Sequence, residues 1–124
     1  MENNKIKNFK DLESWKFSHN FVLSIYKISV SFPEQEKFGL TNQMRRASVS
    51  VTSNIVEGFG RSTKKDKINF YTMAKASLLE VESQILIAKD LGYISEKDSS
   101  NLVSDCDRIG RLISGMIKSA ESWK

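Results

Sequence analysis

Apolar residues recur at alternating steps of three and four along four segments of this chain. That spacing places side chains on one face of an α-helix. It predicts helices at about residues 11–31, 40–60 and 66–91, and from residue 95 onward. The positions expected to face a core are Leu12, Trp15, His19, Val22 and Tyr26 beside Phe21, Ile25, Ile28 and Phe32; Leu40, Met44, Ala47, Val51, Asn54 or Ile55, and Gly58; Tyr71, Ala74, Leu78, Val81, Ile85 and Ala88; and Leu102, Cys106, Ile109, Ile113, Met116 and Ala120.

Helix-breaking and helix-capping residues separate these segments. Phe32-Pro33 ends the first helix, because proline disfavours helical geometry in the residue before it. Capping side chains and glycines mark the other ends. The expected boundaries are an N-cap at Thr41 after Gly39, a stop at Gly58-Phe59-Gly60, capping-box spacings at Thr63 with Asp66 and at Ser95 with Asp98, and a terminus at Gly92.

Four amphipathic helices of roughly 20 residues, each ~30 Å long, predict an all-α fold. Short connections favour an antiparallel up-down-up-down four-helix bundle. We expect residues 1–8 to be a disordered lead-in and residues 9–124 to be a single bundle domain. No apolar run approaches the ~18 residues of a membrane span, and the first residues lack an apolar signal region. We therefore expect a cytoplasmic protein that makes no membrane contact.

The net charge of +4 is concentrated in one quarter of the chain. Residues 36–67 hold seven basic and three acidic side chains, whereas the remainder is balanced. A local basic excess can attract an anion such as nucleic acid. A solvated helix end and turn would show the same composition, so both interpretations stay open. The basic residues are Lys37, Arg45, Arg46, Arg61, Lys64, Lys65 and Lys67.

The residue types needed for catalysis are sparse. His19 is the only histidine and has Lys16, not a carboxylate, three residues before it. It therefore lacks the Glu-x-x-His pair of bundle metal sites. Cys106, the only cysteine, lies on an apolar stripe and is expected to act as a small buried hydrophobe. We expect no catalytic residues, no metal site and no cofactor.

Polar residues of the second and third helices suggest a structural network. Glu57 and Arg61 are four residues apart and should pair along one helix. Glu80 lies on a partly apolar stripe, so its carboxylate should have a partner, for which Arg45 or Arg46 is the natural candidate. We favour a network that fixes helix register or a subunit contact over a ligand site. Its candidate residues are Arg46, Asn54, Glu57, Glu80 and Gln84.

One stretch carries a family resemblance: QMRRASVSVTSNIVEGFGR, residues 43–61. It closely resembles the signature of the bacterial four-helix-bundle family encoded in intervening sequences of 23S ribosomal RNA genes. The resemblance implies a homopentamer, as does the relationship to accessory proteins of diversity-generating retroelements, which present basic surface to nucleic acid. It implies no settled biochemical activity. Further matching positions are Leu12, Trp15, Tyr26, Phe32-Pro33, Phe38-Gly39-Leu40, Phe70, residues 76–84 and Leu91-Gly92-Tyr93.

Two functions follow from these observations. The first is a non-catalytic oligomer that associates with RNA or DNA through the basic end of the second helix and the following turn. The alternative is a structural scaffold or protein-interaction module that binds no nucleic acid. Against the first, only Phe59 offers an aromatic side chain near the basic stretch, and single-strand binders use several. The candidate nucleic-acid-binding residues are Arg45, Arg46, Arg61, Lys64, Lys65 and Lys67.

Overall fold

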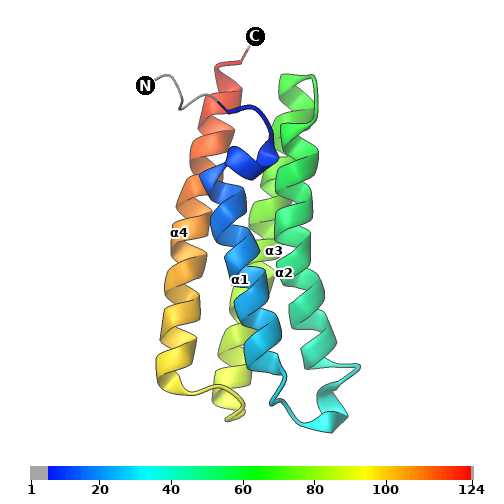
Figure 1. Cartoon of the computed structure of the whole chain (residues 1–124), viewed down its shortest axis with the longest axis vertical. Helices are drawn as coiled ribbons and strands as arrows, with labels where there is room; N and C mark the ends of the chain where they lie inside the picture. The colour runs from blue at the N-terminus through cyan, green and yellow to red at the C-terminus, as the bar shows by residue number, and fades with distance from the viewer. Residues whose placement is uncertain (1–5, 124) are drawn as a thin grey trace.

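The computed structural model describes residues 6–123, which form four long helices. They are α1 (Glu13–Ser29), α2 (Leu40–Phe59), α3 (Lys64–Asp90) and α4 (Glu96–Glu121). Successive helices alternate in direction and pack side by side, and α4 closes against α1 (Figure 1). Short 3₁₀ helices, η2 (Phe9–Asp11) and η3 (Glu34–Glu36), precede α1 and α2. The predicted all-α four-helix bundle is confirmed.

The core of the bundle follows the predicted stripes on three helices. All six expected positions of α3 are buried, as are five of the six on α4, the exception being the half-buried Met116. On α2, the central Met44, Val51 and Ile55 are fully enclosed. These apolar side chains leave water together, which is the main favourable contribution to folding.

The core face of α1 differs from one of its two predicted stripes. Phe21 and Ile25 are buried as expected, but His19 and Tyr26 are exposed. Three serines take the remaining core positions, namely Ser14, Ser18 and Ser29. Small serine side chains let neighbouring helices lie close to α1, while the bulkier Trp15 stays at the edge and stacks on His19.

Helix ends confirm two of the expected caps and correct a third. The side chains of Thr63 and Ser95 accept hydrogen bonds from the backbone N–H groups of Asp66 and Asp98. The predicted cap at Thr41 is wrong, because α2 begins at Leu40 and Thr41 is buried. The η3 turn instead brings the Glu36 carboxylate to the Leu40 N–H, which donates at 3.1 Å.

The lead-in predicted for residues 1–8 falls largely on residues 1–5, which lie outside the described part of the chain. Lys7 and Asn8 are described, and their backbone N–H groups donate to the Asp11 carboxylate. These two hydrogen bonds lower the pKa of Asp11. The side chain of Asn8 in turn caps η2, so this segment is fixed against the start of α1.

Several large apolar side chains lie on the outer surface of the bundle. Leu23 and Tyr26 on α1 and Val30 at its C-cap are 55%, 42% and 76% exposed. Phe38, in the connection before α2, is 87% exposed. No helix within residues 6–123 is long and apolar enough to cross a lipid bilayer. Other exposed apolar residues are Ile6, Val49 on α2, Met73, Leu79, Leu86 and Ile87 on α3, Leu91 and Trp123.

Candidate nucleic-acid interface

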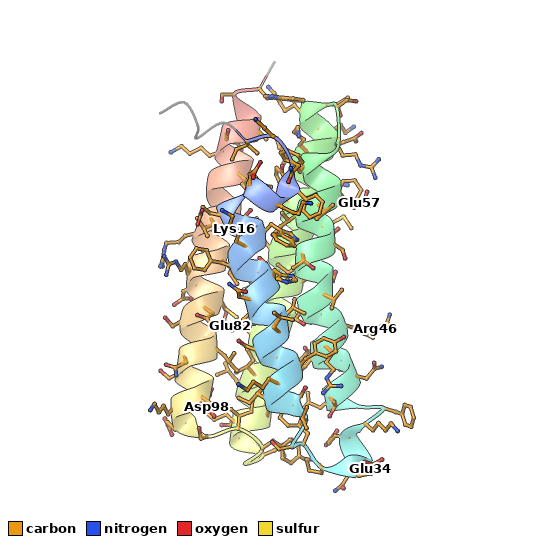
Figure 2. All side chains as sticks on the ribbon, viewed as in Figure 1. Lys16, Glu34, Arg46, Glu57, Glu82 and Asp98 are labelled. Carbon is orange, nitrogen blue, oxygen red and sulfur yellow. The ribbon has the colours of Figure 1, made fainter. Side chains whose placement is uncertain are left out.

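The six candidate cations do not form one cluster. Arg61, Lys64, Lys65 and Lys67 lie at the end of the bundle where α2 meets α3, and the described ends of the chain reach the same end (Figure 1). Arg46 lies far down α2 from Glu57 (Figure 2). At a rise of ~1.5 Å per residue, the α-carbons of residues 45 and 59, both within α2, are about 21 Å apart. The basic excess in the sequence therefore separates into two places.

Arg45 joins α2 to α1. Its Nε donates to Ser29 Oγ at 2.9 Å, its Nη2 donates to the Tyr26 carbonyl at 3.2 Å, and the guanidinium lies 4.7 Å from the Tyr26 ring centroid. Arg46 is exposed and forms no ion pair or hydrogen bond within residues 6–123. The two arginines thus diverge as their adjacent positions predict, with one on a neighbouring helix and one in solvent.

This difference predicts unequal effects of two matched substitutions. Arg45→Ala should lower the free energy of unfolding by about 1–3 kcal/mol, because two hydrogen bonds and a cation–π contact are lost. Arg46→Ala should change it by no more than about 0.5 kcal/mol, as is usual at exposed positions. Urea unfolding followed by circular dichroism measures both. Equal losses of unfolding free energy would contradict the assignment of Arg45 to the α1–α2 contact and of Arg46 to solvent. If only Arg46→Ala reduced the mass of the oligomer, Arg46 would belong to a contact between subunits.

The turn between α2 and α3 carries the exposed cations. Arg61 pairs with Glu57 at 2.6 Å, and its guanidinium lies 4.5 Å from the Phe70 ring centroid. Lys64 and Lys65 are the first two residues of α3, are exposed, and have no acidic partner within residues 6–123. The free N–H groups of a helix N-terminus add partial positive charge at the same point. Of the four candidate cations at this turn, Lys64 and Lys65 are therefore the two that remain available to an anion.

Lys67 has a structural role that its sequence position does not reveal. Its ammonium donates to the carbonyls of Phe59 at 2.8 Å and Gly58 at 3.2 Å, which caps the C-terminus of α2. The same ammonium lies 5.5 Å from the Phe59 ring centroid and 4.8 Å from that of Trp123. Burial lowers the pKa of Lys67. Two of its three donors are thus used within the chain, and Trp123, which is distant in sequence, becomes part of this end.

The predicted polar network divides into short local contacts. Asn54 donates to the carbonyl and hydroxyl of Ser50, and Ser50 Oγ lies 2.9 Å from Ser77 Oγ across the α2–α3 boundary. Glu80 is exposed, and within residues 6–123 its side chain accepts a single long hydrogen bond of 3.4 Å, from Gln84. The expected partnership of Glu80 with Arg45 or Arg46 is not formed, because Arg45 faces α1 and Arg46 faces solvent.

The remaining candidates for chemistry are separated from one another. Cys106 is 2% exposed, and burial raises the pKa of its thiol to about 12, which disfavours the reactive thiolate. His19 lies on the surface of α1 against Trp15. Within residues 6–123, no three His, Cys, Asp or Glu side chains are placed to hold a metal ion together.

Comparison with known proteins shows which protein family has this sequence and fold. Residues 10–115 match the family described as 23S rRNA-intervening sequence protein. The fold is similar to the crystal structure of a protein of unknown function from the S23 ribosomal protein family of Bacteroides thetaiotaomicron, with a TM-score of 0.76 and 26% identity over 85% of this chain and 98% of that one. A search of curated proteins finds no match. The chain therefore belongs to the family of 23S rRNA-intervening sequence proteins.

Proposed function

We propose that this protein is a non-catalytic, oligomeric bundle that associates with RNA or DNA through the basic end of the molecule. The observation that carries the proposal is the pair Lys64 and Lys65 at the N-terminus of α3, which are exposed and have no acidic partner in the described part of the chain. Phosphate groups are attracted both by lysine ammonium groups and by a helix N-terminus. Arg61 lies beside them and can exchange its exposed partner Glu57 for a phosphate, because such pairs are weak.

Assembly of several copies would strengthen a site of so few charges. The exposed apolar residues Leu23, Tyr26 and Val30 recur at steps of three and four along α1 and into its C-cap, a spacing that places them in one stripe. Exposed apolar patches are typical of interaction sites. In a homopentamer, each further contact to the same nucleic acid becomes effectively intramolecular, which raises the overall affinity. The same apolar stripe supports the alternative function, a scaffold or protein-interaction module with no nucleic acid.

Binding of the purified protein to a structured RNA and to duplex DNA across a salt series tests the proposal. The logarithm of the binding constant should fall linearly with the logarithm of salt, by about 0.7–0.9 for each phosphate neutralised. Light scattering in the same buffers should give five times the chain mass of 14.1 kDa. A folded oligomer that binds neither nucleic acid at low salt would leave the scaffold function, and a folded monomer would contradict the pentamer.

A further inference from the structure

The basic end of the bundle contains a hollow beside Lys67 that none of the functions above uses. Its volume is about 350 Å³, within the range of small-molecule sites. Its walls come from the segment before α1, the end of α2, the start of α3 and the end of α4. We call it the end hollow, and its lining includes Leu12, Phe59, Lys67, Tyr71, Met116 and Trp123.

The end hollow combines apolar walls with two polar groups. Tyr71 is 5% exposed, and its ring packs where Gly58 leaves room, since a Cβ at position 58 would lie 2.5 Å from Tyr71 Cε1. Tyr71 lines the hollow, and its hydroxyl forms no hydrogen bond with any residue from 6 to 123. Lys67 retains one N–H beyond the two that cap α2.

Two aromatic side chains, Phe59 and Trp123, lie next to the basic turn, where the sequence alone indicated only Phe59. Trp123 is 43% exposed, so part of its indole is accessible, and Phe59 lies near the same ammonium. Bases stack favourably on such rings whatever their identity, and this stacking is the main contact of proteins that bind single strands. The neighbouring turn carries the unpaired Lys64 and Lys65 for the phosphates on either side of a base.

We propose that the end hollow receives one unpaired base of a single-stranded segment of RNA or DNA. The base lies against Trp123 and Phe59, and its polar edge meets the Tyr71 hydroxyl. The flanking phosphates lie on Lys64 and Lys65. This assignment rests on the proposed function, because it names the part of the nucleic acid that the basic end recognises. It predicts that an unpaired segment binds more tightly than a duplex of equal charge.

Fluorescence of Trp123 tests the assignment directly. Trp15→Phe leaves Trp123 as the only tryptophan of the chain. In this background, single-stranded RNA and DNA octamers should quench Trp123 emission. An abasic octamer, which has the same backbone but no bases, should bind more weakly and cause little quenching. Tyr71→Phe, which removes only the hydroxyl, should weaken octamer binding without altering the fold. Comparison of the RNA and DNA octamers shows whether the ribose hydroxyl contributes.

Substitution of Trp123 provides the second readout. Trp123→Ala should weaken octamer binding about fivefold or more, the loss typical of one stacked base, and leave duplex binding unchanged. Phe38→Ala is the matched control, because Phe38 is an exposed aromatic residue beside Lys37. Both belong to the connection between α1 and α2, which lies at the opposite end of the bundle (Figure 1). It should leave octamer binding unchanged.

The outcomes separate the two proposals. One outcome is that octamer binding depends on Lys64 and Lys65, is unaffected by Trp123→Ala and is equally tight for the abasic octamer. That outcome would overturn the base-binding assignment and leave the proposed function standing. No binding of octamer or duplex at low salt would overturn the proposed function and this assignment together.

Discussion

Gly58→Ala should lower the free energy of unfolding by about 1–3 kcal/mol, the usual cost of an extra methyl group in a packed core. The added Cβ would lie 2.5 Å and 2.6 Å from two atoms of the Tyr71 ring and 3.2 Å from Phe70 Cβ. Those atoms belong to side chains held between α2 and α3, so the two helices must separate or the ring must turn. Denaturant unfolding at fixed protein concentration measures the change, because oligomers are stabilised by mass action.

Gly115→Ala is the matched control for this prediction. Gly115 is also inside a helix, but a Cβ at that position has no neighbour within 4 Å. Alanine should therefore raise stability by about 0.5–1 kcal/mol, because glycine loses more conformational freedom on folding. Effects of the same sign at both positions would contradict the packing of Tyr71 against α2. A displaced Tyr71 ring would also weaken octamer binding at the end hollow.

Reversing two charges at the start of α3 should have the largest effect on nucleic-acid binding. Under the proposed function, Lys64→Glu with Lys65→Glu would replace two phosphate contacts by two repulsions in every chain of the assembly. Affinity at low salt should fall at least about tenfold, and the salt slope should decrease by about 0.7–0.9 for each contact removed. The fold should persist, since both side chains are exposed and acidic residues are favourable at a helix N-terminus. Fluorescence anisotropy with a labelled RNA measures the affinity.

A second double reversal controls for net charge. Lys37→Glu with Lys97→Glu makes the same change in total charge at the other end of the bundle, where both lysines are exposed. If the basic turn is the site, this variant should bind nearly as well as the unsubstituted protein. Equal losses of affinity in the two variants would indicate that only the overall charge matters and that the start of α3 is not a specific binding site.

The regular apolar spacing of α3 and α4 made their core faces predictable from the sequence. The core face of α1 was harder, because a buried serine such as Ser18 has the same sequence pattern as an exposed one. Burial of Ser18 depends on which helices approach α1 and how closely, and neither is a local property. The start of α2 was missed for a local reason: the Leu40 N–H donates to the Glu36 side chain four residues earlier, which the η3 turn brings there, and not to a side chain at the usual N-cap position.

The candidate interface was predictable only in part. The basic turn at Lys64 and Lys65 is contiguous in sequence and was predicted. The structural use of Lys67 and Arg45 was not, because their partners are backbone carbonyls of other helices. Trp123 was missed because it is distant from the basic stretch in sequence, and only the closure of α4 on the bundle brings it to Lys67.

Hydrogen–deuterium exchange with and without a structured RNA at low salt tests the central claim most directly. The first N–H groups of α3 have no partner within the helix, apart from Asp66 N–H, which donates to Thr63. The N–H groups of Lys64 and Lys65 should therefore exchange rapidly in the free protein, whereas those of Gly60 and Arg61 donate to carbonyls of α2. Bound RNA should slow exchange within residues 60–66, most of all at Lys64 and Lys65. Protection there, with none over residues 33–39 at the opposite end, is the predicted result. Bound RNA that leaves residues 60–66 unprotected would contradict the account.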